Sequence, residues 1–360
     1  MGARIVLAGG GTAGHIEPAL AVADAIGAIN PTFTCEFVGT KSGLEVSLVP
    51  ARGYRLRLIP KVVMPRRISM RSIAFPFLLL ATIVRSLRIV RGASLVIGFG
   101  GYVSAPIYLA ARLLSIPIAI HEANAKPGFA NRVGRPVADL VAVNFPEVQR
   151  QWPGSIVTGM PIRKSLVDVA KSDQRSREEL RAKAAEKWGL DPSRPIVAIF
   201  GGSQGSQQIN AVIAEFLKVR TSESVQFLHA VGKANSLPPE MAGYKPLPYF
   251  DDMAAVYAIA DLLITRSGAM TCSELMTLDK FAILLPLDFG NGEQLLNALS
   301  LQNEGRAIVL KGADFSATWL AEHLDEMITK ARSRTPHPSD RHIHAAGEIA
   351  RLALERAGLM

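Results

Sequence analysis

One stretch of the chain has the residue types and spacing of an anion-binding site: LLITRSGAMTCSE, residues 262–274. Its first four residues are an apolar run typical of a buried strand, a short turn follows, and Ala269 begins a predicted helix. A helix start carries partial positive charge and unpaired backbone N–H groups, so it can bind a phosphate without a dedicated cation. Glu274, about one turn further on, can accept hydrogen bonds from two hydroxyls. A phosphate beside a diol is the outline of a nucleotide ribose.

A structural alternative explains the same residues. Ser267 can cap the helix through its side chain, and Glu274 can be a solvated acid of the first turn. The sequence alone leaves both interpretations open.

Glycine turns between a strand and a helix occur in both halves of the chain. Residues 4–8 form a predicted strand, GGGTAGH at 9–15 a turn, and residues 18–26 a helix. From Pro195 the same order recurs as PIVAIF, GGSQG and a helix over 206–219. Two such copies, each followed by alternating strands and helices, predict an α/β protein with two doubly wound, Rossmann-like domains.

The first turn also satisfies the GxGxxG fingerprint of dinucleotide-binding folds, through Gly9, Gly11 and Gly14. That fingerprint includes an acidic residue at the tip of the next strand, where it binds the ribose. The nearest candidate, Glu36, lies inside the predicted strand 34–39. The pattern therefore argues against a dinucleotide cofactor.

The composition limits the class of protein. At 360 residues, with 49% hydrophobic and 20% charged residues, the chain is long enough for about two globular domains. Its two cysteines, Cys35 and Cys272, lack metal-ligand spacing, which argues for a reducing compartment and against a zinc site. No secretory signal is expected, because residues 4–8 already form a predicted strand.

The net charge of +9 is concentrated in residues 1–160, and no acidic residue occurs between Glu45 and Glu122. The basic segment Arg66–Arg91 surrounds an apolar run, Phe75–Val84, that is far shorter than the ~20 residues that span a bilayer. Such a segment is typical of a helix on an anionic membrane surface. No nucleic-acid partner is expected, because aromatic and amide side chains are sparse here. A core helix with solvated arginines is the structural alternative.

Eight short motifs occur in order along nearly the whole chain: GGGTAGH at 9–15, GGYVSAP at 100–106, HEAN at 121–124, GMPIR at 159–163, GGSQGS at 201–206, FDDM at 250–253, SGAMTCSE at 267–274 and EQLLNA at 293–298. In this combination the chain resembles the MurG family, the peripheral membrane N-acetylglucosaminyltransferases of peptidoglycan synthesis. The resemblance implies a GT-B fold, in which two doubly wound domains face a cleft. It also implies inverting transfer of N-acetylglucosamine (GlcNAc) from UDP-GlcNAc to the 4-hydroxyl of MurNAc in undecaprenyl-pyrophosphoryl-MurNAc-pentapeptide (lipid I), which gives lipid II.

The same resemblance divides the chain. Residues 1–161 would form an N-terminal domain that faces the acceptor and the membrane, and residues 162–338 a C-terminal domain that binds UDP-GlcNAc. Residues 339–360 would form a helix that can pack back on the N-terminal domain. The protein would be peripheral at the cytoplasmic face of the bacterial inner membrane. Its partners would be UDP-GlcNAc, lipid I and, through the Arg66–Arg91 region, an anionic membrane surface.

The family's donor-binding positions can be carried over one by one, and they fall in both halves of the chain: Thr12, Ala13, Gly14, Asn124, Arg163, Ser203, Phe250, Ala269, Met270, Thr271, Cys272, Ser273, Glu274 and Gln294. Arg163 and Ser203 can donate to phosphate oxygens. The backbone at Phe250 can pair with the uracil edge, which would leave its side chain fairly free to vary. Gln294 offers donors and an acceptor to sugar hydroxyls.

Some positions depart from the family pattern. Ala13 stands where glycine is usual, which is tolerable only if its φ is negative. Ala123 stands where glutamine is usual, and Phe289 and Glu293 replace a histidine and a glutamine. Sugar contacts near the last two positions are therefore less certain than the rest of the site.

Inverting transfer requires a base for the acceptor hydroxyl and stabilisation of the departing diphosphate. His15, at the end of the first glycine turn, and Glu122, at a predicted strand tip, are the two candidates for the base. The helix start at Ala269, with the turns at Gly9 and Gly201, can stabilise the diphosphate without a metal.

Two further pairs of polar residues have structural explanations. Asp251 and Asp252 could bind a metal ion, but their place before a predicted helix favours capping. His342 and His344 lie two apart on a predicted tail helix and are expected at the surface. No cofactor and no metal site are predicted, whereas the practical need for a divalent ion, the oligomeric state and the peptide variant of the acceptor stay open.

Overall fold

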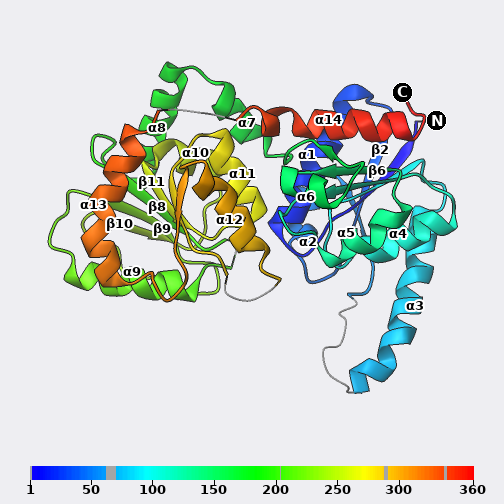
Figure 1. The fold of residues 1–360 in the computed structure, drawn as a ribbon, viewed down its shortest axis with the longest axis horizontal. Coiled ribbons are helices and arrows are strands. Elements are labelled where there is room, and N and C mark those ends of the chain that lie inside the picture. The colour runs from blue at the N-terminus through cyan, green and yellow to red at the C-terminus, as the bar shows by residue number, and fades with distance from the viewer. Residues whose placement is uncertain (1, 62–69, 203, 288–290, 336–338) are drawn as a thin grey trace. The chain divides into compact units, whose positions relative to one another are not determined.

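The computed structural model describes the chain except residues 1, 62–69, 203, 288–290 and 336–338 (Figure 1). Its contacts divide the chain into two compact units, Met1–Arg163 with Arg341–Met360, and Lys164–Asp340. These boundaries lie close to those expected from the sequence, after residues 161 and 338. The two units are described separately.

The first unit is built on a parallel sheet with the strand order β3-β2-β1-β4-β5-β6-β7. Its strands are β1 (Arg4–Ala8), β2 (Thr34–Gly39), β3 (Arg55–Leu58), β4 (Leu95–Gly98), β5 (Ile118–Glu122), β6 (Leu140–Val143) and β7 (Ile156–Val157). The order reverses between β1 and β4. In open α/β sheets, ligands bind beyond the carboxyl ends of the strands at such a switch point.

Helices cover both faces of this sheet: α1 (Ala13–Ile29), α2 (Glu45–Ala51), α3 (Met70–Val90), α4 (Ser104–Leu113), α5 (Phe129–Gly134), the 3-10 turn η1 (Arg135–Val137), α6 (Pro146–Gln151) and α14 (Arg341–Arg356). On one face, α1 and α14 form a core with β1 and β2 that includes Ile16, Leu20 and Ile349. On the other face, α4 and the end of α3 pack over β1 and β4. The last helix of the chain therefore belongs to the core of the first unit (Figure 1).

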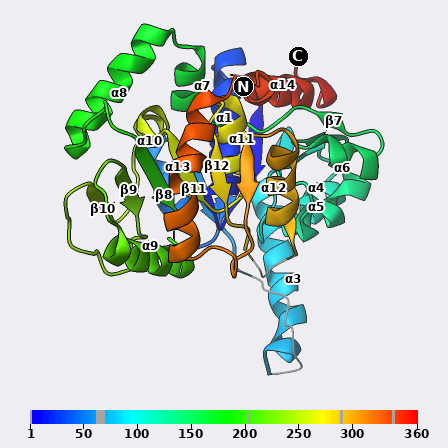
Figure 2. The ribbon, with the colours of Figure 1, turned by 60° about the vertical axis from the view of Figure 1, so that its left-hand side comes forward.

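The second unit repeats the architecture with the strand order β10-β9-β8-β11-β12-β13, again parallel throughout. Its elements are α7 (Lys164–Lys171), α8 (Gln174–Trp188), β8 (Ile196–Phe200), α9 (Gln207–Val219), β9 (Gln226–Ala230), β10 (Tyr244–Leu247), α10 (Met253–Ile259), β11 (Leu262–Thr265), α11 (Ala269–Thr277), β12 (Ala282–Leu284), α12 (Glu293–Asn303), β13 (Ala307–Val309) and α13 (Ala317–Ser333). Helices α9 and α13 share one core with the strands (Figure 2). The switch point lies between β8 and β11.

Glycine turns lie beyond the carboxyl ends of β1 and β4 in the first unit and of β8 in the second, and close backbone contacts there require glycine. Gly101, after β4, has φ +82°, and a Cβ there would lie 2.5 Å from the Gly10 carbonyl oxygen of the neighbouring turn. In the second unit Gly205 has φ +74°, and a Cβ would lie 2.0 Å from the Val231 carbonyl oxygen. The backbone can therefore approach closely at both switch points only because side chains are missing.

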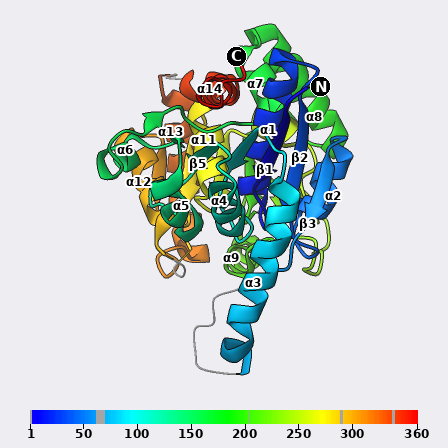
Figure 3. The ribbon, with the colours of Figure 1, turned by 90° about the vertical axis from the view of Figure 1, so that its right-hand side faces the viewer.

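Helix α3 differs from the other helices of the first unit. Its carboxyl-terminal part packs beside α4, whereas its amino-terminal part extends beyond the sheet and the remaining helices (Figure 3). The exposed residues Phe77, Leu78 and Leu80 of α3 belong to the apolar run noted in the sequence.

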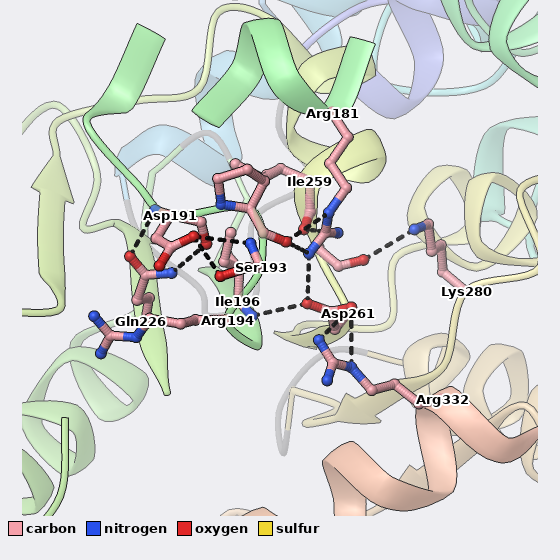
Figure 4. Close-up of polar contacts among 12 residues, drawn as sticks. Arg181, Asp191, Ser193, Arg194, Ile196, Gln226, Ile259, Asp261, Lys280 and Arg332 are labelled. Atoms are coloured by element: carbon pink, nitrogen blue, oxygen red, sulfur yellow. Dashed lines mark hydrogen bonds and ion pairs between the residues drawn. The ribbon is translucent and has the colours of Figure 1, made fainter. Parts of the chain in front are cut away.

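A network of charged side chains lies at the amino ends of β8 and β11, whereas the switch point lies beyond their carboxyl ends (Figure 4). Asp261 accepts hydrogen bonds from Arg181 Nη2 at 3.0 Å, from Arg332 Nε at 3.3 Å and from the backbone N of Ile196 at 2.8 Å. Arg181 also donates to the Ile259 carbonyl oxygen at 2.6 Å. This network joins α8 and α13 to the sheet, and we assign it a structural role.

A buried histidine in the second unit is expected to make the stability of that unit depend on pH. The Nδ1 atom of His229, in β9, lies 3.0 Å from the Tyr244 hydroxyl, and its Nε2 atom lies 3.1 Å from Asn210 Oδ1. The Asn210 Nδ2 group donates to the Val231 carbonyl oxygen, so Oδ1 is the acceptor and Nε2 of His229 carries the proton. Burial lowers the pKa of His229 to about 4.

The second unit is therefore expected to lose stability as the pH falls from about 6.5 to about 4. In this window the unfolded histidine binds a proton and the folded one does not, so acid favours unfolding by about 3 kcal/mol at pH 4. Urea unfolding at pH 7 and pH 4.5 measures this loss. His229→Gln should be less stable at pH 7 but lose less stability on acidification, and an equal loss in both proteins would contradict the prediction.

Candidate active site

The helix predicted after the turn at residues 266–268 is present, and it begins at Ala269 as expected. Gly268 is its N-cap residue and makes no side-chain capping bond. The alternative in which Ser267 caps the helix is wrong, because its hydroxyl donates to the Gln294 carbonyl oxygen at 2.8 Å. The start of α11 therefore lies at the switch point of the second sheet, without a side-chain acceptor from its cap.

Glu274 is buried one turn inside α11, with 2% of its surface exposed. Its Oε2 atom accepts a hydrogen bond from the Tyr257 hydroxyl at 2.8 Å. The alternative of a solvated first-turn acid is therefore wrong. The Tyr257 hydroxyl therefore orients the carboxylate that is predicted to accept hydrogen bonds from the ribose.

The other carried-over residues of α11 fall into two groups. The Cys272 and Ser273 side chains are fully buried, and burial raises the pKa of the Cys272 thiol well above its usual value. These two side chains belong to the core, so a ligand could reach only their backbone. The side chains of Ala269 and Met270 are also largely buried, whereas Thr271 is half-buried.

Gln294, in the first turn of α12, joins three segments near the same switch point. Its Oε1 atom accepts from the backbone N of Leu287 at 3.2 Å, and its carbonyl oxygen accepts from Ser267. Asn297 Nδ2 donates to the Ser267 carbonyl oxygen at 3.2 Å. The acceptor of the Gln294 amide is therefore used within the chain, and its donor group is what can meet a sugar hydroxyl.

The side chain of Phe250 belongs to an aromatic cluster. Its ring centroid lies 6.0 Å from that of Phe200 and 6.3 Å from that of Trp188. The expectation that this side chain is fairly free to vary is wrong, because a smaller residue would leave a cavity in the cluster.

The remaining predictions in the second unit concern Asp251, Asp252 and Ser203. Asp252 caps α10 by accepting from the backbone N of Ala255 at 3.1 Å, which confirms capping. The described residues contain no group of three or more histidine, cysteine or acidic side chains placed to bind a metal ion. Ser203 lies outside the described residues.

In the first unit, the glycine turn leads into α1, with Thr12 as its N-cap residue and Ala13 and Gly14 as its first helical residues. Among described non-glycine residues only Ser115 and Asp279 have positive φ, so Ala13 meets the condition set by its departure from the family pattern. The turn does not present all of its amides outward. The Gly11 N–H donates to Glu45 Oε2 at 2.9 Å, so it is not available to a phosphate.

The imidazole of His15 lies beside Gly100 of the neighbouring turn. Its Nδ1 atom is buried and has no hydrogen-bond partner among the described residues. Burial lowers the pKa of His15, and the Phe99 carbonyl and the negative charge of Glu45 oppose this effect. The imidazole is therefore neutral near pH 7, which is the form that a general base needs.

The second candidate base, Glu122, is engaged by its own loop. Its oxygens accept from the backbone N of Asn124, the backbone N of Gly128 and Asn131 Nδ2, each at 2.9 Å. Asn131 in turn accepts from the Tyr108 hydroxyl at 2.8 Å. Burial raises the pKa of Glu122, while these donors lower it. The geometry therefore favours a structural role for Glu122 and leaves His15 as the better base.

Two residues expected to contact the donor from the first unit have intramolecular contacts. The backbone N of Asn124 donates to Glu122, as described above, and its Nδ2 atom lies 3.4 Å from the same carboxylate oxygen. Arg163 Nε lies 3.5 Å from Glu17 Oε1, and both side chains are mostly buried. Arg163 is therefore oriented by an acid on α1.

Two histidines of the first unit have roles that the sequence did not indicate. His121 is buried in β5, its Nε2 atom lies 2.9 Å from the Gly159 carbonyl oxygen, and burial lowers its pKa to about 4. His342 has 2% of its surface exposed, and its Nδ1 atom accepts from the backbone N of Met160 at 3.0 Å. The predicted surface position is wrong for His342, whereas His344 is exposed. Both buried histidines bind the GMPIR segment.

The two-unit architecture occurs in solved glycosyltransferases. The crystal structure of MurG from Acinetobacter baumannii matches this chain with a TM-score of 0.70 and 26% identity, over 98% of this chain and 99% of that one. The calicheamicin glycosyltransferase CalG4 shares the fold, with a TM-score of 0.63 and 14% identity over 100% of this chain and 98% of that one. Two doubly wound parallel sheets in two units therefore give this chain the GT-B fold of these glycosyltransferases.

The sequence comparisons narrow this class. Residues 5–143 match the glycosyltransferase family 28 N-terminal domain, and residues 196–352 match the C-terminal domain. A relative in Corynebacterium efficiens is 43% identical over 98% of this chain and 97% of its own length, and one in Corynebacterium diphtheriae is 46% identical over 87% and 84%. Both are called UDP-N-acetylglucosamine–N-acetylmuramyl-(pentapeptide) pyrophosphoryl-undecaprenol N-acetylglucosamine transferase. The chain belongs to the MurG family within glycosyltransferase family 28.

Proposed function

We propose that this protein transfers GlcNAc from UDP-GlcNAc to the 4-hydroxyl of MurNAc in lipid I, with inversion at the anomeric carbon, and so forms lipid II in peptidoglycan synthesis. The names of its relatives support the substrates. The observation that carries the proposal is the start of α11 at the second switch point, with the Glu274 carboxylate buried one turn behind it. The helix start can bind a diphosphate and the carboxylate can bind a ribose, and a nucleoside diphosphate contains both groups.

The residues of the second unit would divide the binding of UDP-GlcNAc among them. The amides at the start of α11 meet the diphosphate, whose charge grows as the bond to the sugar breaks. The Glu274 carboxylate, which Tyr257 orients, accepts from the ribose hydroxyls. The backbone at Phe250 pairs with uracil, and the Gln294 amide donates to the sugar.

In the first unit, His15 would act as the base. The 4-hydroxyl oxygen attacks the anomeric carbon, the bond from that carbon to the UDP oxygen breaks, and the hydroxyl proton passes to His15 Nδ1. Backbone amides of Ala13 and Gly14 and the guanidinium of Arg163 are the further donors for the diphosphate.

A radiolabel assay tests the function directly. Labelled UDP-GlcNAc and lipid I in vesicles should give labelled lipid II, and a chelator arm shows whether a divalent ion is needed. Product from another lipid-linked acceptor but not from lipid I would change the substrate. Binding of UDP-GlcNAc without transfer to any acceptor would instead indicate a nucleotide-sensing protein.

We also infer that the protein attaches to an anionic membrane surface through α3, at the cytoplasmic face of the bacterial inner membrane. Two apolar side chains on the extending part of this helix, Phe77 and Leu80, are 73% and 60% exposed. Arg85 and Arg88 on the following turns are exposed as well, whereas Arg66 and Arg67 lie outside the described residues. Among the described residues, no helix combines the length and apolar character needed to cross a bilayer.

Charge reversal on α3 should weaken this attachment. A basic side chain near an anionic surface contributes about 1 kcal/mol, so Arg85→Glu with Arg88→Glu should lower sedimentation with phosphatidylglycerol vesicles at least tenfold. Arg85 also donates to the Leu58 carbonyl oxygen at 2.8 Å, so Arg88→Glu alone separates surface charge from this contact. Arg175→Glu, on exposed α8, is the matched control. Equal sedimentation of all variants would refute the inference.

A further inference from the structure

One buried carboxylate of the first unit has no role in the function proposed above. Glu45, the first residue of α2, is 0% exposed. Its Oε1 atom accepts from the backbone N of Thr40 at 2.7 Å and from the Thr40 hydroxyl at 3.0 Å, and its Oε2 atom accepts from Gly11 N at 2.9 Å. These donors lie just beyond the carboxyl ends of β1 and β2. Glu45 therefore links α2 to the glycine turn that precedes His15.

Three glycines make room for this carboxylate. A Cβ at Gly43 would lie 1.9 Å from Glu45 Oε2, one at Gly39 would lie 2.3 Å from its Cγ, and one at Gly10 would lie 3.0 Å from its Oε1. None of the three has a positive φ. Their backbone conformation is therefore open to other residues, and the space that Glu45 occupies is the reason that glycine is needed.

The bond from Gly11 fixes the conformation of the turn. Gly11 has φ +91°, a conformation that residues with side chains rarely adopt, and its amide donates to Glu45 Oε2 at 2.9 Å. The hydrogen bond to Glu45 directs its amide inward. The chain then passes through Thr12 into α1, which places His15 beside Gly100.

The charge of Glu45 also acts on the base. The titratable groups that act on the His15 imidazole are Glu45 of α2 and His121 of β5, and Asn131 of α5 lies beside the same glycine, Gly100, as a neutral amide. Burial has the largest effect on the pKa of His15 and lowers it, and the charge of Glu45 raises it. An imidazolium formed when His15 takes a proton would be stabilised by the same charge.

We propose that Glu45 is a positioning residue for the transfer reaction, which fixes the glycine turn at Gly11 and provides the negative charge that His15 needs when it accepts a proton. This proposal rests on the function proposed above, with His15 as the base. Burying a carboxylate is costly, and a neutral side chain could make a turn without that cost. The cage of three glycines indicates that the carboxylate itself is used.

The test compares the same substitution at two buried carboxylates of one sheet. Glu45→Gln keeps the shape but replaces one acceptor oxygen with an NH2 group that cannot accept from Gly11 or Thr40. Glu36→Gln is the control, because Glu36 is also buried and binds Arg4, Arg55 and Arg57 within the sheet. For each protein, kcat, both KM values and the pH profile of kcat are measured with lipid I.

Glu45→Gln should lower kcat at least tenfold and raise KM for UDP-GlcNAc by a smaller factor, because the turn also carries the Ala13 and Gly14 amides while the donor-binding residues of the second unit are unchanged. Loss of the negative charge lowers the pKa of His15, so the acid limb of the profile should move to lower pH. Glu36→Gln should alter thermal stability but neither kcat nor the profile. An active wild type with unchanged kcat in Glu45→Gln, or an equal loss in both variants, would overturn the proposal. A wild type without transfer activity would instead overturn the proposed function.

Retained UDP binding and circular dichroism show that the variants are folded. If Glu45→Gln does not fold, Gly43→Ala displaces the carboxylate without removing its charge and should also lower kcat. Gly27→Ala, in α1, is its control because nothing lies within 4 Å of the added Cβ. Equal kcat in Gly43→Ala and Gly27→Ala would contradict the role of Glu45.

Discussion

Replacing His15 with glutamine is expected to lower kcat by a factor of about 10² to 10⁴, the usual contribution of general acid–base catalysis. His15 lies at the end of the first glycine turn, and its buried Nδ1 atom has no partner among the described residues. Glutamine keeps a polar side chain but cannot take a proton at neutral pH. KM for UDP-GlcNAc should stay within about threefold, because the expected ribose contacts lie in the second unit.

The pH profile gives this prediction a second readout. The neutral imidazole is the active form, and burial lowers the pKa of His15. Activity should therefore persist below pH 6.5 and fall only on further acidification, and this limb should be absent in the residual activity of His15→Gln. His344→Gln, at an exposed position of α14, is the control and should match the wild type. Full activity in His15→Gln would place the base elsewhere.

A parallel variant separates the two candidates for the base. Glu122→Gln breaks hydrogen bonds from the loop that carries Asn124 and Gly128, so it should lower stability and activity through the loop. Its acid limb should stay where it is in the wild type. A limb that disappears in Glu122→Gln but not in His15→Gln would reverse the assignment.

The elements that position this site could be predicted because their signals are local. The strand before α11 is a short apolar run, and the helix begins directly after a glycine. In the first unit the sequence predicts a turn over residues 9–15 and a helix over 18–26, whereas α1 already begins at Ala13, so the order of elements is right and the start of the helix is not. In each case hydrophobic pattern and turn chemistry act within about ten residues, which is the range that a sequence shows.

The partners of the site residues could not be predicted, because they come from distant parts of the chain. His342 binds the Met160 amide 182 positions away, although its spacing on a helix indicated only a surface residue. Tyr257 and Glu274 meet only because β11 and α11 follow α10 around the sheet. Ionisable side chains that the sequence presents as candidates for chemistry therefore also make hydrogen bonds within the fold.

The glycines around Glu45 can be seen in the sequence, but the reason for them can be seen only in the structure. Gly39 and Gly43 both precede Glu45 in the segment GTKSGLE, and the sequence offers no turn type that explains both. A glycine without a conformational reason can mark space that another side chain fills. Such a glycine can be identified only when its φ angle is known not to be positive.

Replacing Glu274 with alanine is expected to raise KM for UDP-GlcNAc about a hundredfold. Hydrogen bonds to a charged group contribute about 1.5–3 kcal/mol each, and the loss of about 2–3 kcal/mol corresponds to this factor. Tyr257 orients the carboxylate through a hydrogen bond of 2.8 Å, and the ribose is expected to lose its charged acceptor when Glu274 is removed. The measurement is the initial rate of transfer to lipid I over a range of UDP-GlcNAc concentrations.

Tyr257→Phe distinguishes binding of the ribose from support of the fold. It removes the bond to Glu274 and leaves the carboxylate, so KM should change less than about threefold, while stability falls by about 1–3 kcal/mol. If Glu274 served only to bind Tyr257, the two variants would have the same KM. A hundredfold difference between them would require that the carboxylate contacts the donor itself, because both variants lose the same internal hydrogen bond and only one loses the charge.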